Sequence, residues 1–196
     1  KWIDTSRGIT LIKTKSETHS HGKGGTHSHA VADPYIWSDP DLYLQQARHV
    51  RDALVDRQSA KKDYFDQNLS QLEADLVGLS AKHKEILGQL ERVRFVSNQP
   101  AYNYIARRYK LNLYSENFDS EEPISAGTKK DLLHKLGHSD HEHHHGGHSH
   151  SHGKASFALT VLLWTSEPSA AVKASFPDKI EHVYIDPLVA PTAVEY

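Results

Sequence analysis

Cysteine and methionine are both absent from the 196 residues of the chain. Without thiols the chain can form no disulfide, no thiolate zinc site and no cysteine nucleophile. Because methionine is missing, we expect Lys1 to be the first residue of a processed form or a fragment rather than a translation start. Runs of the roughly 18–20 apolar residues that a membrane-spanning helix needs are also missing, so we expect no direct membrane insertion.

A strong charge of either sign is lacking as well. The chain has 23 basic and 25 acidic residues, a formal net charge of −2 with histidine neutral. This balance argues against a nucleic-acid partner. The sequence also lacks HExxH, GxSxG and a glycine-rich phosphate loop. We therefore expect no enzyme; a zinc-dependent hydrolase is the least favoured alternative, because no base that could activate water lies near a ligand pattern.

Histidine, by contrast, is abundant, and most of it lies in two internal tracts. Residues 18–29 read THSHGKGGTHSH and residues 137–153 read GHSDHEHHHGGHSHSHG, and together they hold twelve of the sixteen histidines. An expression tag is normally terminal and uninterrupted, whereas neutral imidazole is the commonest protein ligand for transition metals. The candidate metal ligands are His19, His21, His27, His29, His138, His141, His143, His144, His145, His148, His150 and His152.

The spacing within the tracts suits zinc. Zn²⁺ takes about four ligands in a tetrahedron, and the two HSH units of the first tract, separated by GKGGT, could fold back on one ion. The second tract could hold more than one ion. Imidazole also suits Ni²⁺ and Cu²⁺, so we expect loose selectivity. Below about pH 6.5 the imidazoles become protonated and lose their capacity to bind metal.

The first half of the chain predicts a β-prone segment at 9–12, a mobile loop at 15–32 and two helices. Asp39 can cap a helix that has Pro40 at its first position and runs to about Val55. A second helix is expected from about 60 to 92. Its apolar stripe predicts a core-packing face rather than a coiled coil. That stripe comprises Phe65, Leu69, Leu72, Leu76, Leu79, Ile86 and Leu90.

Three further features receive structural interpretations. His83 fills the gap in the apolar stripe, which favours a half-buried, hydrogen-bonded histidine over a metal ligand. The acidic run from Glu116 to Glu122 favours a solvated turn, with metal attraction or docking as the alternative. Glu167 follows an apolar strand, where α/β sheets place ligand sites, so it could reach a cleft.

Strands and helices alternate in the second half, which predicts a parallel sheet with covering helices. The expected strands are 94–97, 112–114, 157–164 and 179–185, and the expected helices lie within 101–109, 120–136 and 166–176. The second histidine tract separates a helix from the next strand and is therefore expected to be a surface insertion.

The order of motifs resembles a known family. A histidine-rich loop precedes DPYIWSDP and a long helix; QPAYNYIARRYKL, EEPISAG and VYIDPL follow. This resembles the zinc- and manganese-type (cluster A-I) periplasmic substrate-binding proteins of metal ABC transporters. The resemblance implies an α/β fold: the end of a first lobe, a long linking helix, and a second lobe with a mostly parallel sheet covered by helices. The implied domains are 1–38 with the histidine loop 15–32, the linking helical segment 39–92, and the second lobe 93–196 with its insertion 137–153.

The family's ligand positions carry over unevenly. Tyr35 stands where members often have a histidine in DPHxW, and Gln99 where they have His or Glu. Asp186 in YIDPL matches a family carboxylate, whereas the family's first ligand histidine has no counterpart in this chain. Tyr and Gln are poor zinc ligands beside His or carboxylate.

The resemblance implies a function as a periplasmic zinc receptor. Such a protein would be a monomer that delivers Zn²⁺, or Mn²⁺, to an ABC permease of the inner membrane. In that setting Asp186 would line the cleft together with ligands from the first tract. The alternative is a zinc buffer or metallochaperone with the same fold and no delivery to a permease, which the residues Tyr35 and Gln99 favour.

Overall fold

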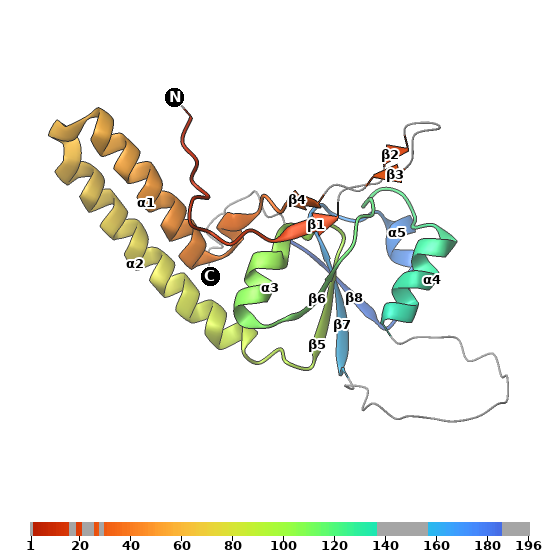
Figure 1. Cartoon of the computed structure of the whole chain (residues 1–196). Coiled ribbons are helices and arrows are strands. Elements are labelled where there is room, and N and C mark those ends of the chain that lie inside the picture. Colours follow the sequence, from red (N-terminus) through yellow and green to blue (C-terminus); the bar gives the residue numbers. More distant parts are fainter. Residues whose placement is uncertain (1, 16–18, 21–25, 28–29, 137–156, 186–196) are drawn as a thin grey trace, which may run out of the picture.

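A four-stranded parallel sheet and a projecting pair of helices make up most of the structure (Figure 1). The structure, a computed structural model, describes residues 2–15, 19–20, 26–27, 30–136 and 157–185. Within these residues, none of the helices has both the length and the apolar character to cross a bilayer. The α/β fold class expected from the alternating pattern is confirmed.

The sheet has the order β6-β5-β7-β8, and every neighbouring pair is parallel. Its strands are β5 (Val93–Ser97), β6 (Asn112–Ser115), β7 (Leu159–Trp164) and β8 (Ile180–Tyr184). Each lies within two residues of its predicted bounds. The run Val161–Leu162 in β7 is buried, as expected for a strand inside a covered parallel sheet.

Short helices connect the strands and cover the sheet. They are η4 (Pro100–Tyr102), α3 (Asn103–Tyr109), α4 (Ala126–Lys135) and α5 (Ala170–Ala174). Ser125 and Ser169 cap α4 and α5 by accepting hydrogen bonds from backbone N–H groups of the first turn. The main core joins α4, α5 and the two central strands. It comprises Val96, Leu132, Leu136, Leu162, Trp164, Val172, Phe176 and Ile180.

Two antiparallel helices form the projecting hairpin, α1 (Pro40–Arg57) and α2 (Lys62–Leu87), joined through η3 (Ser59–Lys61). Asp39 caps α1 with Pro40 at the first position, which confirms the predicted start. The predicted end of α2 at residue 92 is wrong, because the helix ends at Leu87 with Gly88 as its C-cap. Glycine is the residue that most often follows a helix end.

The predicted core-packing face of α2 is only partly correct. Leu76 is buried, but the side chains of Leu79 and Ile86 are 41% and 60% exposed. The stripe packs mainly on α1, and beyond α1 it leaves apolar side chains facing solvent. A heptad stripe gives the direction of an apolar face but not the extent of the partner that covers it.

The N-terminal segment forms two short antiparallel ladders instead of one loop. Strand β1 (Lys13–Lys15) pairs with β4 (Ala30–Ala32), and β2 (His19–Ser20) pairs with β3 (Thr26–His27). The predicted strand at 9–12 is wrong. The carbonyl of Thr10 accepts from Arg107 and the N–H of Ile12 donates to the Tyr104 hydroxyl, so these backbone groups bond to α3 rather than to a neighbouring strand.

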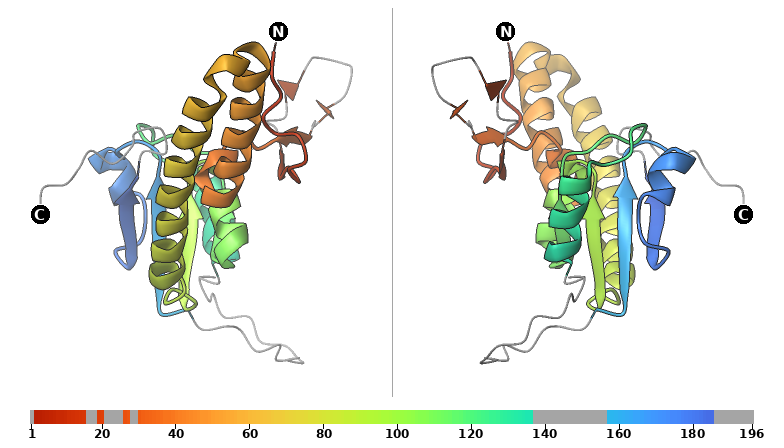
Figure 2. Two further views of the ribbon diagram at one scale, coloured as in Figure 1. Left: turned by 90° about the vertical axis from the view of Figure 1, so that its left-hand side faces the viewer. Right: turned by 90° about the vertical axis from the view of Figure 1, so that its right-hand side faces the viewer.

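The two ends of the parallel sheet differ in what lies there. The carboxyl ends of β5 and β6 lead into Gln99 and Glu116, on the side of the β1–β4 ladder. The end of α4 and the start of β7 lie at the amino-terminal end (Figure 2). The second histidine tract joins these two elements and lies outside the described residues. The domain boundaries at 38/39 and 92/93 stay predictions.

Candidate metal-binding cleft

One large cavity, of about 1130 Å³, contains both substituted family ligand positions. Tyr35 follows the β1–β4 ladder, while Gln99 follows β5 just before η4, and both side chains line this cavity. They are 64 residues apart in the sequence, so only the fold brings them together. We call this space, with Tyr35 and Gln99 in its wall, the cleft.

Asp33 fixes the backbone beside Tyr35. Its Oδ1 accepts from the Tyr35 N–H at 2.9 Å, and its Oδ2 accepts from Asn103 Nδ2 at 3.0 Å. The Tyr104 hydroxyl donates to the Asp33 carbonyl at 3.1 Å. Asp33 is only 1% exposed. Burial raises the pKa of this carboxyl above its ordinary value, and the hydrogen bonds from Tyr35 and Asn103 oppose the shift.

The polar chain continues from Asn103 into the sheet. Asn103 Oδ1 accepts from the Ser115 hydroxyl at 2.5 Å, and the Ser115 hydroxyl oxygen accepts from Ser97 at 3.1 Å. Ser97 and Ser115 end the adjacent strands β5 and β6, where the register sets them opposite each other. The chain of hydrogen bonds therefore links the carboxyl edge of the sheet to the loop that carries Tyr35. This link was not predicted from the sequence. The available signal was Asp33 before Pro34, because aspartate is a common turn residue.

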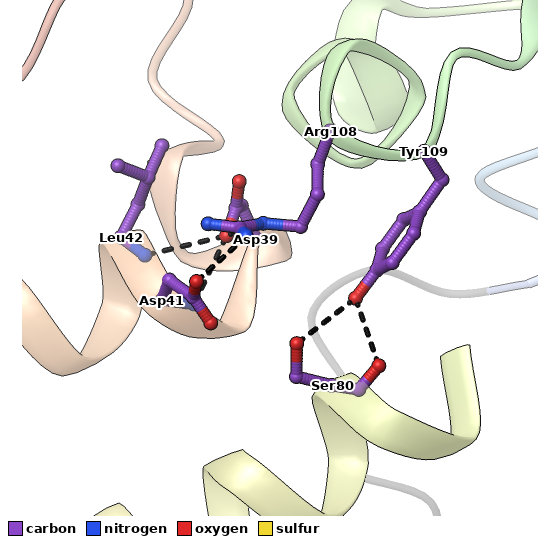
Figure 3. A network of polar contacts seen from close by, with 6 residues as sticks. All are labelled: Asp39, Asp41, Leu42, Ser80, Arg108 and Tyr109. Carbon is purple, nitrogen blue, oxygen red and sulfur yellow. Dashed lines mark hydrogen bonds and ion pairs between the residues drawn. The ribbon is translucent and has the colours of Figure 1, made fainter. Parts of the chain in front are cut away.

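A second contact fixes α3 against the helical hairpin (Figure 3). Arg108 Nε donates to Asp39 Oδ1 at 2.6 Å, and Arg108 Nη1 lies 2.6 Å from Asp41 Oδ2. The same Asp39 oxygen accepts from the N–H groups of Asp41 and Leu42, which makes it both cap and ion-pair partner. At the next residue of α3, the Tyr109 hydroxyl lies 3.3 Å from both the hydroxyl and the carbonyl oxygen of Ser80.

The acidic residues between Glu116 and Glu122 lie in two different environments. Glu116 forms an ion pair with Lys135 at 2.7 Å and lines the cleft. Asp119 accepts from the N–H of Glu121 in an exposed turn, which confirms the predicted solvated turn for that part. Glu167 is exposed and is not among the residues that line the cleft, contrary to the suggestion that it could reach it.

Two isolated histidines prove to be packed against aromatic rings. His83 is half-buried as predicted and meets the ring of Tyr109 edge-on at 5.8 Å, but its buried Nδ1 has no hydrogen-bond partner among the described residues. Burial lowers the pKa of His83, against the opposing effect of Asp39. His182 stacks on Trp164, and its Nδ1 accepts from the indole N–H at 3.0 Å. Burial lowers the pKa of His182, with Lys173 adding to the shift and Glu181 opposing it.

Only two of the predicted metal ligands, His19 and His27, lie within the described residues. The register of β2 and β3 pairs His19 directly with His27. Among the described residues no cluster of three or more His, Asp or Glu side chains could hold a metal ion. The other ten predicted histidines and Asp186 lie outside the described residues. These are His21, His29, His138, His141, His143, His144, His145, His148, His150 and His152.

Ile185, the residue before Asp186, is the last described residue, and two hydrogen bonds fix its backbone. The N–H of Ile185 donates to the Trp164 carbonyl at 2.9 Å, and the Tyr102 hydroxyl donates to the Ile185 carbonyl. Tyr102 belongs to η4, the turn that directly follows Gln99. Ile185, the last described residue, therefore lies at the carboxyl end of β8, beside the turn that follows Gln99.

Comparisons with known proteins agree on one family. The family profile described as "ZnuA: Zinc-uptake complex component A periplasmic" matches residues 1–140. The chain is 26% identical over 112 residues to the high-affinity zinc uptake system protein ZnuA of Bacillus subtilis, which covers 56% of this chain and 35% of that protein. It is 33% identical over 93 residues to the zinc-binding lipoprotein AdcA of Streptococcus pneumoniae, which covers 47% of this chain and 18% of that protein. These matches therefore span about a third or less of the relatives' length.

Solved structures show the same fold. The Zn(II)-bound ZnuA-like domain of Streptococcus pneumoniae AdcA matches with a TM-score of 0.66 at 19% identity, over 95% of this chain and 58% of that chain. A crystal structure of ZnuA matches with a TM-score of 0.62 at 25% identity, over 95% of this chain and 63% of that chain. The resemblance drawn from the motifs is thereby confirmed. The chain belongs to the family of the periplasmic zinc-uptake complex component A.

Proposed function

We propose that the chain is part of an extracytoplasmic zinc-binding protein that supplies Zn²⁺ to an ABC-type importer. The observation that carries the proposal is the family match over residues 1–140, which includes the first histidine tract and both wall positions of the cleft. Relatives named for zinc uptake and zinc binding support the choice of metal. Metal capture and release involve no bond-breaking chemistry, so the proposed role is that of a receptor rather than an enzyme.

The histidine tracts are the proposed metal ligands. The pairing of His19 with His27 brings the backbones of one histidine from each HSH unit of the first tract side by side. Four imidazoles within this tract equal the number of ligands that zinc takes. The second tract adds eight imidazoles and the capacity for further ions. Ni²⁺ and Cu²⁺ would compete for both tracts, because imidazole binds them at least as well.

Asp186 is the proposed ligand nearest to the cleft. Its neighbour Ile185 is tied to Tyr102, and this tie supports a position near Gln99. One carboxylate beside Tyr35 and Gln99 is a weak zinc site, so ligands from the first tract would have to complete it.

A second candidate function is a zinc buffer or metallochaperone that does not deliver metal to a permease. The observation that favours it is the presence of Tyr35 and Gln99 in the cleft, where neither side chain is a good zinc ligand. A buffer needs the tracts but not the cleft. Deleting the gene separates the two: a receptor's loss lowers the rate of zinc uptake at limiting zinc, whereas a buffer's loss leaves that rate unchanged and lowers the zinc retained.

Zinc titration by calorimetry at neutral pH tests where the metal binds. The full chain should show more than one binding phase. Deletion of 138–152 should remove the weaker multi-ion phase, and replacing the four histidines of the first tract by glutamine should remove the tight phase. Asp186→Ala should weaken the tight phase alone. His134→Gln, an exposed histidine on α4, is the control and should change neither. If both tract variants bind zinc with unchanged stoichiometry, the proposed ligands are wrong.

A further inference from the structure

The lining of the cleft has an excess of positive charge, which disfavours the binding of a bare divalent cation. Its lining includes the basic residues Lys13, Arg107, Lys110 and Lys135 but only one carboxylate, Glu116, a formal sum of +3. The whole chain has a formal charge of −2, so the basic residues are concentrated here. Like charges repel a cation across such a space, and the repulsion is greater for a divalent ion.

Glu116 offers no charge to a cation, because it already pairs with Lys135 at 2.7 Å. Within the described part of the chain, Lys13 and Lys110 have no ion-pair partner. Arg107 has no carboxylate partner there either; it donates to the Thr10 carbonyl at 3.0 Å and lies over the ring of Tyr104. Lys13 and Lys110 therefore have no carboxylate partner among the described residues, and Arg107 has only the through-space attraction of the buried Asp33 carboxylate.

The fold brings these three residues to the cleft from two segments of the chain. Arg107 lies in the last turn of α3, Lys110 is the C-cap of the same helix, and both line the cleft. The contact of Arg107 with Thr10 brings the N-terminal segment onto α3, and Lys13 follows three residues later. The N–H of Ile12 donates to Tyr104 on the same helix and fixes this approach.

Lys110 occupies a position that suits glycine better. It ends α3 in the left-handed conformation with φ of 55°, where a residue with a side chain is strained relative to glycine. Helices that end in this way usually have glycine there. Residues held in such conformations gather at ligand-binding sites, and here the side chain supplies one of the unneutralised charges.

We propose that the cleft binds a small multivalent oxyanion, such as a di- or tricarboxylate, on the part of its wall that carries Lys13, Arg107 and Lys110. The volume of about 1130 Å³ fits a small organic molecule, whereas a metal ion needs ligands at about 2 Å. The neutral hydrogen-bonding groups of Tyr35, Gln99 and Ser115 complete the wall. This inference goes beyond the proposed zinc function and is tested on metal-free protein, so either can fail without the other.

Calorimetry with citrate and with inorganic phosphate on the metal-free chain, at about pH 8 where free imidazole is neutral, tests the proposal. We expect one binding event with citrate or phosphate, and the stronger of the two identifies the source of the oxyanion. Affinity should fall several-fold when salt rises from about 20 to about 200 mM, because exposed charges are screened. Absence of binding with all of these anions overturns the proposal.

Three variants locate the anion. Lys13→Gln combined with Lys110→Gln should weaken binding roughly tenfold, since each exposed charge contributes up to about one factor of five. Lys110→Gly should weaken binding while it raises the melting temperature, because it removes the charge and the backbone strain together. Lys130→Gln, an exposed lysine of α4 away from the cleft, should change nothing. Equal affinity in the wild type and the first two variants would place the anion elsewhere.

Discussion

The guanidinium of Arg94 lies 4.1 Å from the centroid of the Phe157 ring. The same guanidinium donates to the carbonyl oxygen of Leu136. Leu136 and Phe157 are the last described residue before and the first described residue after the second histidine tract. One side chain at the start of β5 therefore holds both ends of the insertion together.

Replacing Arg94 by alanine should lower the free energy of unfolding by about 1–3 kcal/mol. The change removes a charge-assisted hydrogen bond and a cation–π contact of about 0.5–1 kcal/mol. Urea unfolding followed by circular dichroism measures the loss. Arg92→Ala, which removes an exposed arginine two residues earlier, should cost less than about 0.5 kcal/mol. Equal losses in the two variants would mean that Arg94 does not anchor the insertion.

Breaking the ion pair between Arg108 and Asp39 should be costlier than breaking a comparable surface pair. Asp39 is 3% exposed and also caps α1. Arg108→Ala leaves this carboxylate buried without its cation, so we expect a loss of about 2 kcal/mol or more. The reference is Arg48→Ala, whose pair with Glu73 has a similar distance of 2.8 Å but exposed side chains. That variant should lose no more than about 1 kcal/mol. Thermal unfolding of both variants decides the order.

Asp33 and Asn103 should show energetic coupling. Asn103→Ala leaves the buried Asp33 carboxylate without this partner, and Asp33→Ala leaves the half-buried Asn103 amide without it. Each variant should cost about 1–3 kcal/mol. In the double variant the shared hydrogen bond is lost only once, so the combined loss should fall short of the two single losses by about 1 kcal/mol. A double-mutant cycle by denaturant unfolding measures this difference. Strict additivity would show that the hydrogen bond between them contributes nothing to stability.

His182 should make stability depend on pH in the acidic range. Its pKa in the folded chain lies below the ordinary 6.5, mainly through burial. The unfolded chain therefore takes up the proton first as the pH falls. The stability that neutral His182 contributes is present above pH 6.5 and is lost as the pH drops through the folded-state pKa. Protonation also removes the Nδ1 acceptor that Trp164 uses.

His182→Gln tests this dependence, because the amide oxygen can still accept from the indole but does not titrate. The free energy of unfolding between pH 7 and about pH 5 should fall less steeply in this variant than in the wild type. His134→Gln on the exposed side of α4 serves as the matched control. A slope that is unchanged by His182→Gln would contradict the assignment.

The strands of the sheet could be predicted because their apolar runs are local signals. FALTVLLW gave β7 and KIEHVYI gave β8 with small errors at the ends. The N-terminal error at 9–12 has a non-local cause, since the partners of that backbone, Tyr104 and Arg107, lie more than 90 residues away. No periodicity within the segment reports such partners.

The candidate site was predicted less well than the fold. Tyr35 and Gln99 drew attention only through the family resemblance, and the structure then brought both to one cavity. Asp33 and Arg108, which hold that cavity together, have no metal-ligating or catalytic pattern around them. Their roles depend on burial and on partners such as Asn103 and Asp39, which the sequence does not place.

The second histidine tract separates α4 from β7, and the flanking residues lie at the amino-terminal end of the sheet. This point of insertion is suitable for protein engineering. Leu136 and Phe157 meet at Arg94, on the edge opposite to the strand ends that lead to Gln99. A fluorescent reporter grafted between these two residues would start and finish at nearly the same point. It would thereby label the molecule without crowding the cleft.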